Sequence, residues 1–118
     1  MTTIGIIGSG NVGSGLASVL SRAGHTVRIT NSDPSGDKLA RVAAQAGATP
    51  ASAADAIASD VVVLALPYRP ALAFVREHAA SLAGRVVIDA VNPLTNDFRE
   101  QETESGTSAA EEFAAAAP

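Results

Sequence analysis

The chain contains no cysteine and no tryptophan, and its only aromatic residues of the Phe/Trp/Tyr type are one tyrosine and three phenylalanines among 118 residues. The absence of cysteine excludes disulfide bonds and thiolate metal sites. The scarcity of aromatic residues argues against an aromatic-rich β-sandwich. Most of the apolar bulk comes from alanine, valine, leucine and isoleucine, a mixture that suits alanine-rich helices packed on a Val/Ile sheet. The length provides for one hydrophobic core.

Long hydrophobic runs and an excess of positive charge are also missing. No segment approaches the roughly 18 apolar residues of a membrane span. The first apolar run is interrupted by Gly5 and Gly8 and lacks the basic lead-in of a signal peptide. The net charge of −4 argues against DNA or RNA as a ligand. We therefore expect a cytoplasmic domain with a small-molecule ligand, no membrane contact and no nucleic-acid partner.

Glycine, in contrast, is concentrated near the start, where the stretch IGIIGSGNVGSGLA (residues 4–17) has glycine at five of fourteen positions. Residues 8–13 (GSGNVG) match the pattern GxGxxG. Gly8 permits a sharp turn, Gly10 lets the backbone approach a pyrophosphate, and Gly13 lets the next helix press onto the first strands. The pattern follows a predicted strand rich in β-branched residues and lies at the start of a predicted amphipathic helix. In this context it predicts that a dinucleotide binds at the helix N-terminus. A glycine turn without a ligand is the alternative.

Segments typical of strands and helices alternate along most of the chain. Strands are predicted at residues 3–7, 26–30, 60–66 and 85–91, with a short extended piece at 48–50. Helices are predicted from Val12 to Ala23, from Asp33-Pro34 to Ala46, over residues 51–59 and over residues 70–82. This alternation predicts an α/β fold: a Rossmann-like, doubly wound parallel sheet in three layers, α/β/α. The sheet is expected to lack the usual last strand and a second domain.

The end of the second predicted strand indicates which dinucleotide to expect. NAD-binding domains place Asp or Glu about 20 residues beyond the glycines, where it holds the ribose 2′-OH. Here Asn31 stands eighteen residues after the last glycine of the pattern, followed by Ser32. The lack of a carboxylate permits a 2′-phosphate, and Lys38 or Arg41 can bring positive charge from the next helix. NADP is therefore favoured over NAD, although Asp33 has the wrong sign and both cations are equally compatible with a solvated helix face.

Two further loops are expected beside the dinucleotide, because ligands of such sheets lie across the carboxyl ends of the central strands. One is Leu66-Pro67-Tyr68 after the fourth strand, and the other is Asn92-Pro93 after the fifth. Tyr68 either flanks the cofactor or packs in the core, and Asn92-Pro93 either faces the nicotinamide or ends the strand in a plain turn. No catalytic set or metal cluster stands out, and hydride transfer needs none.

Three stretches together resemble the amino-terminal domain of NADP oxidoreductases that depend on the deazaflavin coenzyme F420. They are residues 4–29 with the glycine pattern, residues 60–72 (DVVVLALPYRPAL) and residues 85–95 (RVVIDAVNPLT). The resemblance implies hydride exchange between reduced F420 and NADP. It also implies the site residues: Ser9, Gly10, Asn11 and Val12 at the pyrophosphate, Asn31 and Ser32 with Lys38 at the 2′-phosphate, Pro67 and Tyr68 in the middle of the cleft, and Asn92-Pro93 at the nicotinamide.

The chain departs from this family in two ways. Members usually have a Ser-Arg pair where this chain has Asn31-Ser32, which lacks the arginine. Family chains also continue beyond Pro118 with a strand and a helical part that complete the deazaflavin pocket and the dimer. We accordingly assign residues 1–94 to a Rossmann NADP-binding core, and residues 95–118 to a polar loop and an alanine-rich helix of the same domain. The part that would complete the pocket is expected to come either from a second copy in a homodimer or from a missing C-terminal half.

Two other functions fit the same sequence. β-Hydroxyacid dehydrogenases, imine reductases and pyrroline-carboxylate reductases share this type of first domain but take substrate groups from a second one. A non-catalytic nucleotide-binding module is the third interpretation, because fold alone does not determine function.

Overall fold

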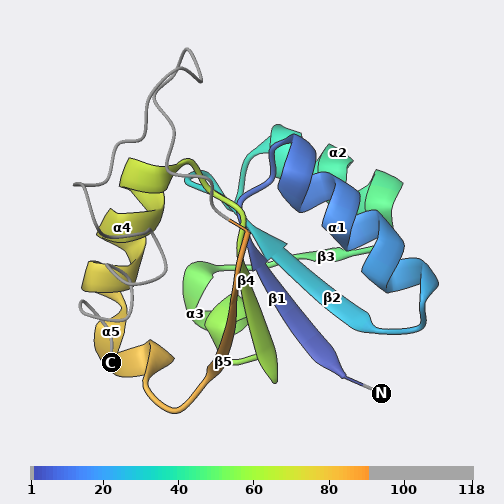
Figure 1. Ribbon diagram of the computed structural model, residues 1–118. Helices are drawn as coiled ribbons and strands as arrows, with labels where there is room; N and C mark the ends of the chain where they lie inside the picture. The colour runs from blue at the N-terminus through green and yellow to red at the C-terminus, as the bar shows by residue number, and fades with distance from the viewer. Residues whose placement is uncertain (1, 91–118) are drawn as a thin grey trace, which may run out of the picture.

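The computed structural model describes residues 2–90, which form a five-stranded sheet in which every paired strand is parallel (Figure 1). The strands are β1 (Thr3–Ile7), β2 (Thr26–Thr30), β3 (Thr49–Pro50), β4 (Val61–Leu64) and β5 (Val86–Asp89), in the order β3-β2-β1-β4-β5. The helices are α1 (Asn11–Arg22), α2 (Asp37–Ala46), α3 (Ala53–Ile57), α4 (Tyr68–Glu77) and α5 (Ala79–Leu82). No helix within residues 2–90 is long and apolar enough to cross a membrane.

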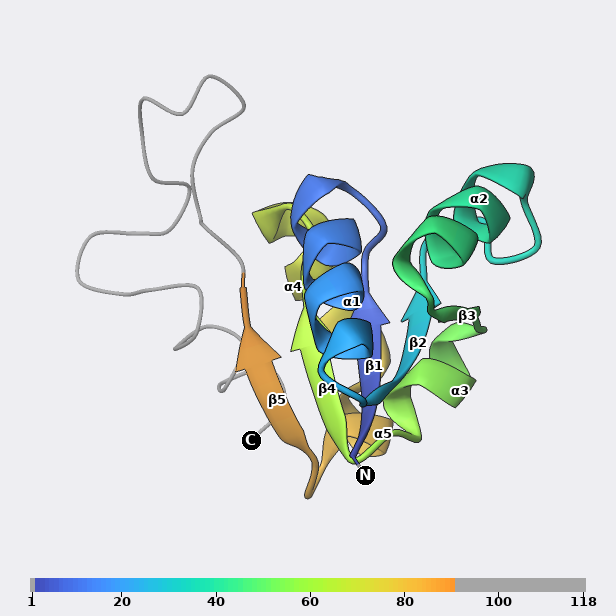
Figure 2. The same ribbon diagram turned by 90° about the vertical axis from the view of Figure 1, so that its right-hand side faces the viewer.

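The helices cover both faces of this sheet. α1 and α2 lie on one face, and α3, α4 and α5 lie on the other (Figures 1 and 2). From β1 the chain moves outward to β2 and β3, then returns to the centre at β4 and moves outward on the other side to β5. The predicted Rossmann-like α/β fold is confirmed, with its change of direction between β1 and β4. That is the place where such sheets bind their ligands, at the carboxyl ends of the strands.

Each face of the sheet has its own buried cluster. The cluster under α1 and α2 contains Ile4, Ile6, Ala17, Val27, Ile29, Leu39, Ala43, Ala46 and Val63. The cluster on the other face contains Ile7, Ala56, Ile57, Val62, Leu64, Tyr68, Ala71, Val75 and Leu82. Successive residues of β4 alternate between the two clusters, so its continuous apolar run is explained by burial on both faces.

Small residues bring helices close to the strands. A Cβ atom on Gly5, in the middle of β1, would collide with the backbone carbonyl oxygen of Ala56 in α3. On the other face, α1 turns Gly13 and Ala17 toward the sheet, and both are buried. The helical spacing of apolar residues in α1 predicts that Leu16, Leu20, Val12 and Val19 face the sheet. This prediction is right for Leu16 and Leu20, which pack against the buried cluster, and wrong for Val12 and Val19, which are 53% and 62% exposed.

The structure confirms the predicted start of α3 but not that of α2. The spacing of Ser52 and Asp55 in the sequence predicts an N-cap and an N3 residue. The structure confirms this cap, since the Ser52 hydroxyl accepts a 3.2 Å hydrogen bond from the backbone N–H of Asp55. The predicted start of α2 at Asp33-Pro34 was wrong, because the helix begins at Asp37. Asp33 and Gly36 instead close a turn with a 3.0 Å backbone hydrogen bond. Pro34 is suited to such a turn as well as to a first helical position.

The predicted helix over residues 70–82 is two helices. α4 begins earlier, at Tyr68, and ends at Glu77, and α5 follows after His78. The rings of Phe74 and His78 are in contact at this junction, with their centroids 4.3 Å apart.

Strand β5 is apolar but exposed on both sides. Val86 and Ile88 are 61% and 51% exposed, and Val87 is 39% exposed. The register pairs Val86 with Val61 and Ile88 with Val63, so these two side chains lie on the face that carries α1. α1 does not extend over β5 in Figure 2. The predicted loop and helix at residues 95–118 lie outside the described residues.

Candidate dinucleotide site

The loop between β1 and α1 is held between the ends of two neighbouring strands. The backbone N–H of Gly8 donates a 2.9 Å hydrogen bond to the carbonyl oxygen of Thr30, the last residue of β2. Gly8 has φ +121°, which favours glycine. A Cβ atom at Gly8 would also collide with the backbone of Ala65, just beyond β4. Glycine is thus required at this turn by the protein's own packing.

Gly13 has a similar role on the first turn of α1, and Gly10 does not. A Cβ atom on Gly13 would run into the carbonyl oxygen of Gly8, so the helix packs directly against the loop. A Cβ atom on Gly10 would meet nothing within 4 Å, and φ at Gly10 is −76°, which any residue can adopt. Packing within residues 2–90 therefore does not explain glycine at position 10. Close approach of a ligand to this backbone would explain it, and the open backbone fits a dinucleotide pyrophosphate.

The N-terminus of α1 is suited to an anion. Gly10 is the N-cap residue, no side chain caps the helix, and its first turn contains no acidic residue. The first N–H groups of a helix have no partner within the helix and lie at the positive end of its dipole. The backbone N–H groups of Asn11, Val12 and Gly13 are therefore available to phosphate oxygens.

Asn31 and Ser9 are brought together from two different loops. The amide nitrogen Nδ2 of Asn31 donates a 3.0 Å hydrogen bond to the hydroxyl oxygen of Ser9. The amide oxygen Oδ1 of Asn31 accepts a 2.9 Å hydrogen bond from the backbone N–H of Asp33. Asn31 thus links the loop after β2 to the glycine loop. Sequence reasoning placed both residues in the site but did not predict this contact, because they stand 22 residues apart.

Thr30 adds an unpaired buried hydroxyl next to this link. Its side chain is 1% exposed, and its Oγ1 has no hydrogen-bond partner in the structure. Ser59, on the α3 side of the molecule, is the other such buried hydroxyl among residues 2–90. Buried hydroxyls without a partner are uncommon.

The remaining predicted site residues lie in different surroundings. Leu66 is near the glycine loop, since its Cδ2 would lie 3.3 Å from a Cβ atom on Gly8. Pro67 is exposed at the start of α4, but Tyr68 is 5% exposed and belongs to the core cluster, as the packing alternative requires. Ser32 and Lys38 are exposed, with Lys38 in the first turn of α2. The predicted Asn92-Pro93 contact lies outside the described residues.

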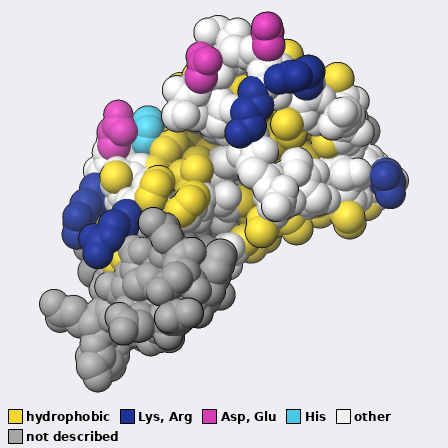
Figure 3. All heavy atoms as spheres, turned by 90° about the horizontal axis from the view of Figure 1, so that it is seen from above, with side chains coloured by type: hydrophobic (Ala, Val, Ile, Leu, Met, Phe, Trp, Pro, Cys, Tyr) yellow, Lys and Arg dark blue, Asp and Glu magenta, His cyan; other side chains and the backbone are white. Residues whose placement is uncertain are grey.

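The face seen from above, onto the carboxyl ends of the strands, combines apolar groups with charged groups of both signs. Figure 3 shows hydrophobic side chains in its middle and Lys and Arg side chains on either side, with Asp and Glu side chains also present near them at the margin. Within residues 2–90, no cluster of His, Asp and Glu side chains could hold a metal ion.

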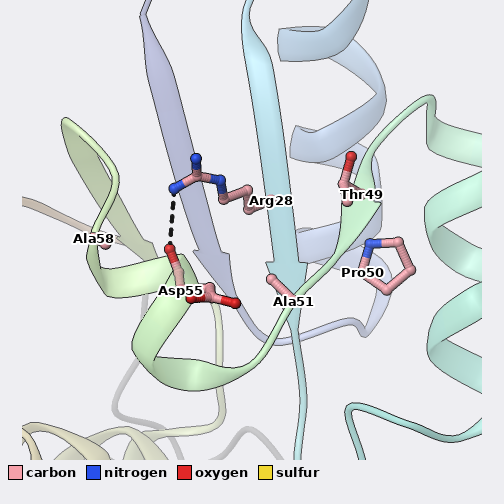
Figure 4. Close-up of a pocket in the computed structure, with 6 residues that line it drawn as sticks. All are labelled: Arg28, Thr49, Pro50, Ala51, Asp55 and Ala58. Atoms are coloured by element: carbon pink, nitrogen blue, oxygen red, sulfur yellow. Dashed lines mark hydrogen bonds between the residues drawn. The ribbon is translucent and has the colours of Figure 1, made fainter.

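A separate cavity lies beside β2 and β3, near α3. Its volume is about 560 Å³, and none of its lining residues belongs to the predicted dinucleotide site (Figure 4). The lining residues are Arg28, Thr49, Pro50, Ala51, Asp55 and Ala58. Arg28 donates from Nη1 to the backbone oxygen of Asp55 at 3.2 Å, so its guanidinium lies beside α3.

A sequence model of a known family matches residues 3–93, well over half of the chain. The family is described as NADP oxidoreductase, coenzyme F420-dependent. The chain belongs to this family. The match includes the glycine loop, the Asn31 turn and all five strands of the sheet. The resemblance inferred from the sequence is thereby confirmed.

Solved structures agree with this membership. A hypothetical protein of Sinorhizobium meliloti is 30% identical with a TM-score of 0.86, and the match covers 100% of this chain and 58% of that one. A protein of Arthrobacter sp. FB24, provisionally described as an F420-dependent NADP-reductase, is 25% identical with a TM-score of 0.82. That match covers 96% of this chain and 57% of the other. A comparison with curated proteins finds no match.

Other solved structures match over a smaller part of their own length. The 3-hydroxyisobutyrate dehydrogenase of Mycobacterium tuberculosis is 28% identical with a TM-score of 0.65, and the match covers 77% of this chain and 32% of that one. The chain therefore spans less than two thirds of the length of each of these structures.

Proposed function

We propose that this domain binds NADP(H) within an oxidoreductase that exchanges a hydride between NADP and the deazaflavin coenzyme F420. The observation that carries the proposal is the open backbone at Gly10, where the first turn of an uncapped helix leaves room for a diphosphate. Family membership supports the oxidoreductase chemistry, and the Arthrobacter structure supports the choice of F420 and NADP.

The protein's part in this reaction is to hold and orient the dinucleotide. The backbone of Gly8, Gly10 and Gly13 gives the diphosphate its place, and the N–H groups of Asn11 and Val12 donate to it. The bound nicotinamide supplies or accepts the hydride, so the chain needs no acid–base pair for the transfer itself. Its contribution is positioning and the exclusion of water. We place the nicotinamide near Asn92-Pro93 and the middle of the cleft at Leu66-Pro67, with Tyr68 supporting that loop from the core.

The preference for NADP over NAD rests on the turn after β2. Asn31 carries no charge where NAD enzymes have a carboxylate, so a 2′-phosphate meets no repulsion from it. Ser32 can donate a hydrogen bond, and Lys38 and Arg41 stand exposed on α2. Their positive charge favours a 2′-phosphate over a free 2′-hydroxyl.

Titration with NADPH and NADH side by side tests the cofactor, and turnover with reduced F420 tests the reaction. Tight binding of NADPH, weaker binding of NADH and reduction of NADP by reduced F420 are expected. Equal affinity for the two dinucleotides would contradict the assignment of Asn31 and Ser32. Tight NADPH binding without turnover of F420 would favour a nucleotide-binding module. Turnover of imines or hydroxyacids instead would favour the chemistry of the dehydrogenase and reductase relatives.

A further inference from the structure

The Asn31–Ser9 hydrogen bond has a defined direction. The backbone N–H of Asp33 can only donate, so the Asn31 side-chain atom 2.9 Å from it is the oxygen. The other end of the amide, which faces Ser9 at 3.0 Å, is therefore the nitrogen, and it can only donate. Ser9 must accept in this hydrogen bond. This assignment follows from the chemistry of the neighbouring groups and does not depend on telling oxygen from nitrogen by shape.

Ser9 consequently keeps its own hydrogen for another partner. A serine hydroxyl has one hydrogen to donate, and in this structure the Ser9 hydroxyl donates to no group among residues 2–90. The side chain is 9% exposed, so water has little access to it. A shielded donor of this kind normally meets an acceptor. Ser9 immediately precedes Gly10, the N-cap of α1, where the proposed diphosphate lies.

We infer that Asn31 is a positioning residue that directs the hydroxyl hydrogen of Ser9 toward the diphosphate of the dinucleotide, an inference that rests on the proposed function. Asparagine at this position then acts on the diphosphate through Ser9, in addition to leaving room for a 2′-phosphate. An aspartate at position 31 keeps the acceptor for the Asp33 N–H but cannot donate. Ser9 would then donate to that carboxylate, and its hydrogen would be lost to the ligand.

A double-mutant cycle of Asn31→Asp and Ser9→Ala tests this coupling, with the dissociation constant of NADPH as the readout. The new charge of N31D repels phosphates with or without the serine, so that effect cancels in the cycle. Ser9→Ala alone is expected to weaken NADPH binding about tenfold, the size of a lost hydrogen bond to a charged group. In the N31D background the same replacement is expected to change affinity less than about twofold. Equal losses in both backgrounds would overturn the inference.

Two matched measurements separate this role from others. Ser14→Ala removes a hydroxyl from the first turn of α1, just after the loop that holds Ser9, but that hydroxyl donates to the backbone oxygen of Asn11 at 3.3 Å. It is expected to leave NADPH affinity within about twofold, and thermal unfolding checks that each variant is folded. NADH is expected to lose as much affinity from Ser9→Ala as NADPH does, because both contain the diphosphate. A loss confined to NADPH would place Ser9 at the 2′-phosphate and overturn the inference. Failure of the wild-type chain to bind either dinucleotide would overturn the proposed function as well, whereas binding with additive mutations would overturn the inference alone.

Discussion

Gly8 and Thr30 are joined by a 2.9 Å backbone hydrogen bond that fixes the glycine loop to the end of β2. On its other side, Gly8 lies against the backbone of Ala65, whose own N–H donates to the carbonyl oxygen of Ile7 at 2.8 Å. The loop is thus enclosed by the ends of the three central strands. It has little freedom to move away when something is added to the turn of α1 above it.

Replacement of Gly13 by alanine is therefore expected to destabilise the domain. The added Cβ would collide with the carbonyl oxygen of Gly8, and we expect the free energy of unfolding to fall by about 1–3 kcal/mol, as for other overpacked sites. Urea unfolding measures the change. Gly15→Ala is the matched control, since a Cβ there meets nothing within 4 Å. Alanine should stabilise that position in α1 by about 0.5–1 kcal/mol. Destabilisation of equal size at both positions would contradict the contact.

The fold was largely predictable from the sequence because strands and helices alternate and each strand is rich in β-branched residues. The buried face of α1 was predicted only in part. The spacing of apolar residues selected Leu16, which packs against the core, but also Val12 and Val19, which are exposed. The buried Ala17 was missed, because a count of large apolar side chains does not detect a small residue that allows close approach.

Strand β5 provides a prediction about exposed apolar side chains. Val86→Thr is expected to change the free energy of unfolding by less than about 0.5 kcal/mol, because Val86 is 61% exposed. Val63→Thr, the same change on the same face at a residue 2% exposed, is expected to cost about 1–3 kcal/mol, since it buries a hydroxyl. Chemical denaturation of the 118-residue chain measures both. A comparable cost at Val86 would mean that β5 is covered in solution by another part of the protein or by a second chain.

The candidate site could be proposed from the sequence only where the residue type at one position is informative. The spacing of the glycines pointed to the loop between β1 and α1. An asparagine at position 31, where NAD-binding domains have a carboxylate, pointed to the turn after β2. The contact between Asn31 and Ser9 depends on how two loops meet in space, and no local pattern contains that information. The burial of Tyr68 was an open alternative for the same reason, because a tyrosine after a strand fits either a cleft or a core.

Gly10 separates ligand binding from folding. Gly10→Val is expected to lower the free energy of unfolding by only about 1 kcal/mol, the cost of a poorer N-cap residue, because the structure has open space around this position. The new side chain would occupy the path of the diphosphate, so the affinity for NADPH should fall at least about a hundredfold. Fluorescence titration and thermal unfolding of the same sample measure the two effects. Retained affinity would show that the diphosphate does not approach Gly10, and a large loss of stability would show that the loop is tighter than the structure indicates.

Lys38 tests the discrimination between the two dinucleotides. Its ammonium group is exposed in the first turn of α2, so its attraction to a 2′-phosphate is weakened by water and salt. Lys38→Ala is expected to weaken NADPH binding about three- to fivefold, the range of an exposed charge pair, and to leave NADH binding unchanged. The loss should shrink as ionic strength rises. Arg22→Ala is the control. It removes a cation from the last turn of α1, at the amino ends of the strands and away from the proposed site, and should affect the binding of neither ligand. An equal loss for NADPH and NADH would assign Lys38 to the diphosphate or to general attraction, and the 2′-phosphate would then depend on Ser32 and Arg41.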